Sequence, residues 1–194
     1  MVKIKVTNGL IIDPANQINE IGTLTIADGQ IVSILKENND FTPDIHIDAQ
    51  NQVVCPGFID LSVRLRDPGQ SYKGTIASET AAAAAAGVTS LCLPPDTSPV
   101  IDTQAVVELV HDRSEKAGYT GIYPVGALTL KLAGKELSSM AALKEAGCIA
   151  VSNGNAPLTN LLVLRRAMEY ASTHDLLVMI RPDIPALSNQ GCMH

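Results

Sequence analysis

The sequence predicts an α/β fold in two parts, a small β unit followed by a parallel sheet covered by helices. Two observations lead to this prediction. Residues 1–52 consist of short segments that alternate between apolar and polar residues, whereas residues 53–194 repeat an order of strand, helix and strand with almost continuously apolar strands. Continuous apolar strands are typical of a parallel sheet buried by helices, and alternation is typical of strands with one solvated face.

Three alternating segments define the expected β unit, over residues 2–12, 22–35 and 44–49. Turn pairs accompany them. Asn8-Gly9 and Asp28-Gly29 are typical of two-residue hairpin turns, because both residue types tolerate positive φ. We therefore expect a small antiparallel unit over residues 1–52.

The second part is expected to contain five strands with four helices between them. The strands are expected over 54–65, 88–94, 120–128, 148–153 and 175–182, and the helices over 75–87, 101–118, 137–147 and 159–174. Asp102 or Thr103 fits a helix N-cap, and Gly87 and Gly118 fit helix C-terminal ends. The alanine run 81–86 predicts a helix packed so closely on the sheet that only methyl side chains fit. A (β/α)₈ barrel and a doubly wound sheet both satisfy this order.

The composition excludes several classes of function. The chain has 194 residues, 46% of them hydrophobic, and a net charge of −6. This charge argues against general nucleic-acid binding, which depends on neutralising phosphates. No apolar run approaches the roughly 18 residues that a membrane span requires. We expect a soluble, cytoplasmic protein in which Cys92 and Cys148 are buried free thiols, since no CxxC spacing occurs.

The stretch 57–70, GFIDLSVRLRDPGQ, combines an apolar face with a charged one. Its period of two places four apolar residues on one face, Ile59, Leu61, Val63 and Leu65. The opposite face carries four polar residues, Asp60, Ser62, Arg64 and Arg66. In a parallel barrel the apolar face meets helices, and the polar face lines the interior up to the rim where active sites form. Asn153 and Arg181 end later strands at the same level.

These residues resemble the signature of the type I-like dihydroorotases of the amidohydrolase superfamily, which reads Asp-x-His-x-His-Leu-Arg-Glu-Pro-Gly. The matching positions are Asp60, Leu65, Arg66, Pro68 and Gly69, while Asp67 replaces the Glu. The segments LPPDTSPVIDT, VSNGNAPL and MIRPDIPALSNQGCMH continue the resemblance to the end of the chain. The resemblance implies the first five strands of a (β/α)₈ TIM-like barrel over residues 53–194, preceded by the N-terminal part of a small β-sandwich over residues 1–52.

The resemblance also implies where the family's metal ligands would lie. The two signature histidines correspond to Ser62 and Arg64, a metal-binding Asp to Asn153, and a later histidine to Arg181. Zinc requires imidazole, carboxylate or thiolate ligands, and a protonated guanidinium has no lone pair to offer. We therefore expect no zinc and no catalytic residue, unlike the zinc-dependent active relatives.

Two further positions correspond to residues that bind the substrate in the family. Arg66 stands where the family grips a substrate carboxylate, and Asp96 replaces an Asn that helps to hold it. Binding of a small anion by this pair therefore stays open. We also expect the guanidiniums to supply the positive charge of the missing metal, with Arg64 and Arg181 pairing with Asp60 and Asp183.

Three functions follow from these observations. The leading one is a non-catalytic dihydroorotase homologue that assembles with aspartate carbamoyltransferase in pyrimidine biosynthesis, as a structural or regulatory subunit of a homo- or hetero-oligomer. The second is a working cyclic amidohydrolase of the dihydroorotase, hydantoinase or allantoinase type. The third is a sensor that binds a small carboxylate through Arg66. Because a (β/α)₈ barrel needs about 250 residues, we expect the chain to be the N-terminal portion of a longer protein.

Overall fold

The structure, a computed structural model, describes residues 2–35 and 40–182. The chain divides into two compact units, residues 1–56 and 57–194. Asp183, the expected partner of Arg181, and the rest of the matched segment up to residue 194 lie outside the described residues. Among the described helices, none combines the length and the apolar character needed to cross a bilayer.

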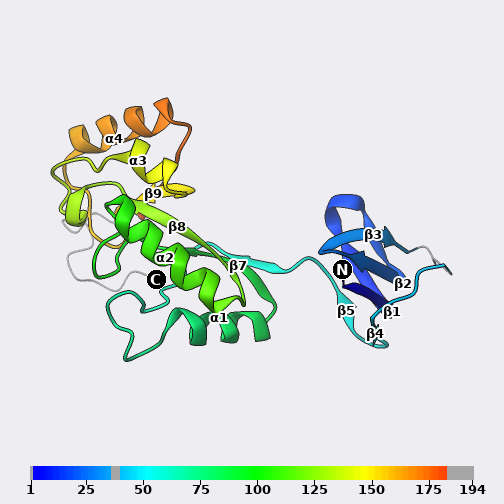
Figure 1. The fold of residues 1–194 in the computed structure, drawn as a ribbon. Coiled ribbons are helices and arrows are strands. Elements are labelled where there is room, and N and C mark those ends of the chain that lie inside the picture. The colour runs from blue at the N-terminus through cyan, green and yellow to red at the C-terminus, as the bar shows by residue number, and fades with distance from the viewer. Residues whose placement is uncertain (1, 36–39, 183–194) are drawn as a thin grey trace, which may run out of the picture. The chain divides into compact units, whose positions relative to one another are not determined.

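The first unit is a single mixed sheet and not the purely antiparallel unit that was expected (Figure 1). The strands run in the order β3-β2-β1-β4, and β5 also pairs with β1. The pairs β1–β2 and β2–β3 are antiparallel, whereas β4 and β5 lie parallel to β1. The elements are β1 (Lys3–Asp13), η1 (Pro14–Asn16), β2 (Ile18–Ala27), β3 (Gln30–Ile34), β4 (Ile45–Asp48) and β5 (Val53–Val54).

One of the two predicted turns in this unit is confirmed and the other is wrong. Asp28-Gly29 joins β2 to β3. Asn8-Gly9 instead lies inside β1, where Asn8 has a φ of 62° and the register with β2 shifts. The positive φ forms a bulge in place of a turn, and the bent strand pairs with β4 before the bulge and with β5 after it.

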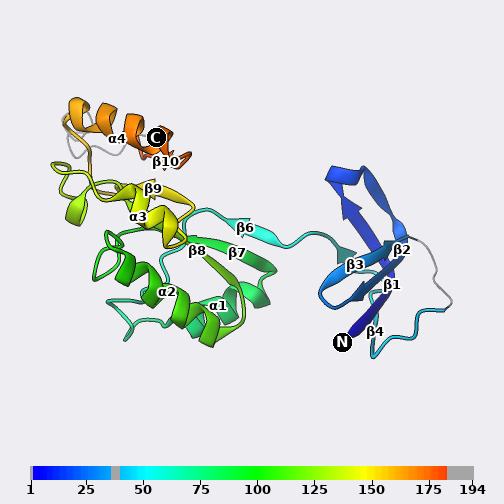
Figure 2. The same ribbon diagram turned by 45° about the horizontal axis from the view of Figure 1, so that its top comes forward.

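The second unit is a parallel sheet of five strands in the order β10-β9-β8-β7-β6 (Figures 1 and 2). Each strand is added on the same side of the previous one. A doubly wound sheet reverses its order, so this topology is that of an open part of a barrel. The predicted order of elements is confirmed, over β6 (Phe58–Asp60), α1 (Ile76–Ala85), β7 (Val88–Leu93), α2 (Gln104–Ala117), β8 (Gly121–Ala127), η2 (Leu130–Leu132), α3 (Met140–Glu145), β9 (Ala150–Ser152), α4 (Leu161–Thr173) and β10 (Leu177–Met179).

The two faces of this sheet carry different clusters. On one face α2 packs between α1 and α3, and the shared core contains Leu91 of β7, Val107 of α2 and Leu143 of α3. The opposite face carries a small cluster in which Cys92 contacts Val125 and Ala150. Leu91 and Cys92 are neighbours in β7 and point to opposite faces of the sheet, and only the face of Leu91 contacts α2 and α3 in the main core. The helices therefore cover one face, as in a barrel wall (Figure 2).

Strand β8 changes its neighbour along its length. Residues 121–124 pair with β7, and residues 125–127 pair with β9. This stagger tilts successive strands relative to one another, which is what a closed barrel requires. The carboxyl ends of β7, β8 and β9 therefore lead into loops on the same rim.

The alanine helix and the first barrel strand both differ from expectation. In α1 the buried residues are Ile76 and Thr80. Ala83 packs against the main core, but most of the alanines in 81–86 are exposed, so the run as a whole is not closely packed on the sheet. Strand β6 ends at Asp60, because the Asp60 carboxylate accepts a local hydrogen bond from the backbone N–H of Ser62.

The apolar face of that first strand is only half covered. Leu65 is fully buried in the main core, as predicted. Ile59 and Leu61 are 67% and 62% exposed, so the expectation that helices cover them is wrong within the described residues. The segment returns to the sheet only at Val63, whose N–H donates to the carbonyl of Cys92.

Candidate functional site

Two cavities lie where the strands of the second unit end, and they share one guanidinium. The first, which we call the loop cavity, has a volume of about 90 Å³ and is bounded by Arg64, Arg66, Gln70, Leu93, Asp96 and Ser98, among others. The second, which we call the rim cavity, has a volume of about 230 Å³ and is bounded by Ser62, Arg64, Val125, Asn155, Met179 and Arg181, among others. Arg64 contributes to both.

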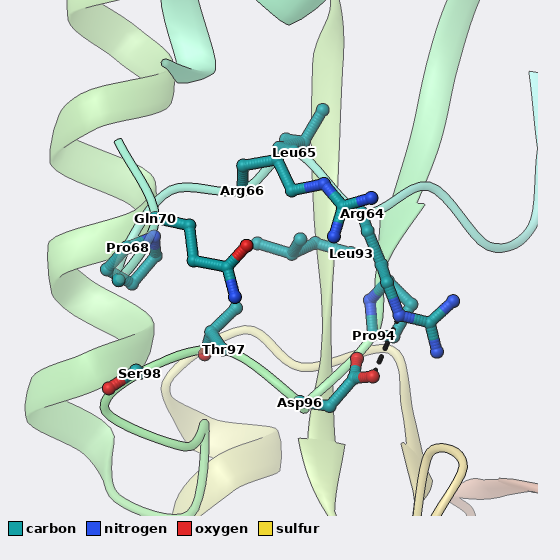
Figure 3. Close-up of a pocket in the computed structure, with 11 residues that line it drawn as sticks. Arg64, Leu65, Arg66, Pro68, Gln70, Leu93, Pro94, Asp96, Thr97 and Ser98 are labelled. Carbon is teal, nitrogen blue, oxygen red and sulfur yellow. Dashed lines mark hydrogen bonds and ion pairs between the residues drawn. The ribbon is translucent and has the colours of Figure 1, made fainter. Parts of the chain in front are cut away.

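The loop cavity lies between the segment after β6 and the segment after β7 (Figure 3). Arg66 and Asp96, the two predicted substrate-binding positions, both line it. Arg66 has a φ of 63°, a left-handed conformation that is uncommon for a long side chain. The Gln70 carboxamide points towards Leu93 in this view and adds a neutral donor and acceptor to the wall.

Arg64 and Asp96 form an ion pair, with 2.8 Å between Arg64 Nε and Asp96 Oδ2 (Figure 3). This pair corrects the expectation that Arg64 pairs with Asp60. The Asp60 carboxylate instead accepts the N–H of Ser62 at 3.0 Å. The preference has a local cause, because Asp60 and Ser62 are two residues apart and close an Asx-type turn that occupies the carboxylate.

The rim cavity collects three of the four predicted metal positions, Ser62, Arg64 and Arg181. Arg181 Nη1 lies 3.4 Å from Asn155 Oδ1, a neutral oxygen. The expected partner Asp183 lies outside the described residues. The cavity wall therefore carries two guanidiniums and no carboxylate among its described residues.

Asn153, the fourth predicted metal position, does not face either cavity. It is 3% exposed, and its Oδ1 accepts from Thr129 Oγ1 at 2.6 Å. Its Nδ2 donates to the carbonyl oxygens of Ala156 at 3.0 Å and Leu132 at 3.3 Å. Both the oxygen and the nitrogen of the amide are therefore engaged in hydrogen bonds, which connect the loop after β8 to the loop after β9.

The described residues do not fit a zinc ion. They contain no group of three or more His, Cys, Asp or Glu side chains placed to hold a metal. Of the four family metal positions, two are guanidiniums, one is a hydroxyl, and Asn153 is buried in other hydrogen bonds. Guanidiniums repel a divalent cation and have no lone pair for it, so no metal-bound water can be assigned to this part of the chain.

An ion pair between the buried carboxylate of Asp67 and the partly exposed guanidinium of Arg113 was not foreseen from the sequence. Asp67 is 6% exposed and accepts from Arg113 Nη1, from Ser71 Oγ at 2.8 Å and from the N–H of Ile76 at 3.3 Å. These contacts fasten the loop after β6 to α1 and α2. Asp67 lies in the matched signature, but no local pattern indicates Arg113, which is 46 residues away.

The predicted buried thiols are confirmed. Cys92 and Cys148 are free and buried, whereas Cys55 is exposed. Burial raises the pKa of Cys148 to about 12. Burial also raises the pKa of Cys92, and the nearby negative charge of Asp60 adds to this shift. Neither thiol has thiolate character near neutral pH, so neither is suited to nucleophilic chemistry.

Comparison with known proteins shows that the chain is similar to dihydroorotases and dihydroorotase-like proteins. The sequence model of the "Dihydro-orotase-like" family matches residues 51–194. A dihydroorotase-like protein of Pseudomonas aeruginosa is 44% identical over 98% of this chain and 45% of its own length. A dihydroorotase of Anaeromyxobacter sp. is 39% identical over 97% of this chain and 44% of its own length.

Solved structures of two hydantoinases share the fold described above. The L-hydantoinase of Arthrobacter aurescens superposes with a TM-score of 0.82 at 17% identity, over 98% of this chain and 44% of that one. A D-hydantoinase superposes with a TM-score of 0.70 at 23% identity, over 93% and 40% of the two chains. The chain thus spans less than half the length of the relatives it matches, and it has the fold of the amidohydrolase barrel over that span.

Proposed function

Since this chain belongs to the dihydroorotase-like family, we propose that it is part of a non-catalytic member of that family, with a structural or regulatory role. The alternative, a zinc-dependent cyclic amide hydrolase, requires a metal-activated water at the barrel rim. One observation carries the proposal. The side chains at the family's metal positions are hydrogen-bond donors or are already engaged, since Arg64 pairs with Asp96 and Asn153 is bonded at both ends.

The partner that we propose for this role is aspartate carbamoyltransferase, in cytoplasmic pyrimidine biosynthesis. The support is the resemblance to degenerate family members that assemble with this enzyme. A protein without turnover of its own is retained when its surface stabilises or regulates an assembly. The proposal predicts that the two proteins form one complex of defined stoichiometry.

The first experiment measures zinc content and dihydroorotate hydrolysis on the full-length protein. We expect less than one tenth of an equivalent of zinc and no turnover. The double variant Ser62→His with Arg64→His restores the two signature histidines and serves as a matched control. We expect it to stay inactive, because Asn153 still faces away from the cavity. Stoichiometric zinc together with turnover in the unaltered protein would refute the non-catalytic role.

The second experiment tests the partner. The protein is mixed with aspartate carbamoyltransferase from the same organism and analysed by size-exclusion chromatography with light scattering. We expect co-elution as a single complex and a change in the melting temperature of the transferase. Separate elution at micromolar concentrations would refute the partner role while leaving the absence of catalysis intact.

A second candidate function is a sensor for a small carboxylate. The observation that favours it is the placement of Arg66 and Asp96 on the wall of one cavity of about 90 Å³. Dihydroorotate should then raise the melting temperature of the full-length protein without being hydrolysed. The increase should disappear in Arg66→Gln. An unchanged melting temperature at millimolar dihydroorotate would exclude the sensor.

A further inference from the structure

We propose that the loop of residues 66–76, which we call the docking loop, is a contact surface for the partner protein, and that Tyr72 inserts into an acidic hollow of that partner. This inference rests on the proposed function, since it names the part of the chain that would hold the assembly together. The argument depends on the exposure of Tyr72, the rigidity of the docking loop and the charges that the loop presents.

Tyr72 is the most exposed large apolar side chain in the described part of the protein, at 81%. Other exposed apolar side chains lie on elements at the open ends of the sheet, such as Ile59 on the edge strand β6 and Leu161 on α4. Closure of a barrel covers such positions. Tyr72 instead lies in the loop after β6, outside every described helix and strand. An aromatic side chain of this kind is typical of a protein–protein interface.

The docking loop is held in place by the carboxylate of Asp67. This buried group accepts from Arg113 Nη1, from Ser71 Oγ at 2.8 Å and from the N–H of Ile76 at 3.3 Å. Ser71 directly precedes Tyr72, and Ile76 begins α1. The carboxylate therefore fixes the loop on both sides of the exposed ring, at the residue before it and at the helix that follows.

Backbone turns and one side-chain contact restrict Tyr72 further. The N–H of Gln70 donates to the carbonyl of Arg66 at 2.6 Å, and the N–H of Lys73 donates to the carbonyl of Gln70 at 2.8 Å. Lys73 Nζ lies 5.6 Å from the centroid of the Tyr72 ring, a cation–π contact. An aromatic side chain on a preorganised loop loses little conformational entropy on binding, and this favours its use as an anchor.

The charges that the docking loop presents to solvent are positive. Arg66 and Lys73 are exposed, and neither belongs to an ion pair among the described residues. The acids near them are engaged or partly buried, since Asp67 and Asp96 each form an ion pair and Glu79 is half-buried. A partner surface that approaches this loop therefore meets two cations, and carboxylates on that surface would complement them.

The net charge of the chain favours a protein as the occupant. Nucleic acids and anionic membranes are large polyanions, and a net charge of −6 opposes their approach. A local acidic patch on a folded partner avoids most of this repulsion, because charges separated by more than about 8 Å are largely screened at physiological salt. We therefore expect a hollow that accepts one phenol ring and has carboxylates at its edge.

The test is the affinity of the full-length protein for aspartate carbamoyltransferase from the same organism, measured by biolayer interferometry at low and high salt. Tyr72→Ala should weaken binding by about tenfold or more, as truncation of an aromatic anchor does. Tyr72→Phe keeps the ring and should stay within about threefold of the unaltered protein. Lys73→Gln should weaken binding at low salt and reduce its salt dependence, because a cation of the interface is lost.

Tyr119 provides the matched control. It is 61% exposed and lies just before β8, at the amino ends of the strands. Tyr119→Ala should change the affinity by less than about twofold, as for an exposed side chain outside the contact. A second measurement needs no variant. Nitration by tetranitromethane, read by mass spectrometry, should modify Tyr72 in the free full-length protein and leave it protected in the complex, while Tyr119 reacts in both.

Two outcomes would overturn the inference while leaving the partner role intact. One is a complex that Tyr72→Ala binds as tightly as the unaltered protein does. The other is a Tyr72 that reacts equally in the free protein and in the complex, or in neither, because the ring would then lie outside the interface or beneath another part of the chain. Failure of the unaltered protein to form any complex would instead refute the partner role, and this inference with it.

Discussion

Arg64 Nε and Asp96 Oδ2 lie 2.8 Å apart and join the segment after β6 to the segment after β7. The two side chains are 35% and 25% exposed, so solvent screens the pair and its contribution to folding is about 1 kcal/mol or less. Its importance is orientational. By occupying Nε, Asp96 fixes the direction in which the rest of the guanidinium faces.

Asp96→Asn is predicted to change ligand binding more than stability. The free energy of unfolding should change by less than about 1 kcal/mol, because the pair is partly exposed. The affinity for dihydroorotate, the ligand of the proposed sensor, should rise severalfold, because a negative charge on the wall of the loop cavity is removed. Chemical denaturation and isothermal titration measure the two effects. A weaker affinity would show that the orientation imposed by Asp96 outweighs its charge.

Asn153→Asp is predicted to destabilise the protein, although it restores the acidic residue of the family. A carboxylate oxygen would face the carbonyl oxygens of Leu132 and Ala156, which now accept from Nδ2. An uncompensated buried acceptor of this kind costs about 3 kcal/mol. Urea denaturation should detect this loss, and zinc content should not rise.

The exposed neighbour Asn155 provides the control for that substitution. Asn155→Asp adds the same charge beside Arg181, where Nη1 already lies near the Asn155 oxygen. Stability should stay within about 0.5 kcal/mol of the unaltered protein, as for most surface substitutions. Equal losses for the two variants would mean that added charge on this loop matters, and that the buried hydrogen bonds of Asn153 do not.

Stability is predicted to fall above pH 9 because of Cys148. Burial raises the pKa of this thiol from 9.0 to about 12 in the folded protein. The unfolded state therefore loses its proton first, so the contribution is complete below pH 9 and is lost as the pH rises towards 12. The slope approaches about 1.4 kcal/mol for each pH unit.

Cys148→Ala isolates that effect from the titration of other groups. The substitution costs a constant amount from the lost packing, and the difference in stability from the unaltered protein should shrink above pH 9. Denaturation series from pH 7 to pH 11 measure this difference. A difference that stays constant across the series would show that Cys148 ionises as readily in the folded state as in the unfolded one.

The ion pair of Asp67 and Arg113 is predicted to be energetically coupled. A double-mutant cycle with Asp67→Asn and Arg113→Gln should give a coupling energy of about 1–2 kcal/mol, since the carboxylate is buried while the guanidinium is partly exposed. Proteolysis should cut the segment 66–76 faster in each single variant, because these contacts hold it. Additive single effects would show that the carboxylate acts mainly through Ser71 and Ile76.

Gly69→Ala is predicted to disrupt the loop cavity. Gly69 has a φ of +118°, and an added Cβ would lie 2.7 Å from Ser98 Cβ and 2.9 Å from its carbonyl oxygen. Gly118→Ala is the matched control, because its φ of +69° also disfavours a side chain but its nearest contact is 3.9 Å away. We expect Gly69→Ala to lose about 2 kcal/mol more stability than the control, because of overpacking. Equal losses would attribute the effect to the backbone conformation.

The order of strands and helices was predictable from the sequence because burial imposes a visible pattern. Continuous apolar runs marked the strands of the parallel sheet, and Gly118 marked the end of α2, where its φ is 69°. The choice between a barrel and a doubly wound sheet was not visible in the pattern. It depends on the order in which strands pair, which is a long-range property.

The sequence predicted which residues line the candidate site, but it did not predict which partners they contact. Arg64 and Arg181 were expected at the rim, and both line the rim cavity. The partner of Arg64 was not foreseen, because the choice between Asp60 and Asp96 depends on the local turn that occupies Asp60. The direction of Asn153 depends on Thr129, 24 residues earlier, and no short-range pattern encodes it.

Arg64 belongs to the wall of both cavities, and this has a thermodynamic consequence. A single guanidinium cannot present the same edge to two ligands at once. Whatever turns it towards the loop cavity withdraws a donor from the rim cavity, so the two occupancies are linked. Linkage is reciprocal, so two ligands that engaged Arg64 from the two cavities would change each other's affinity by the same factor.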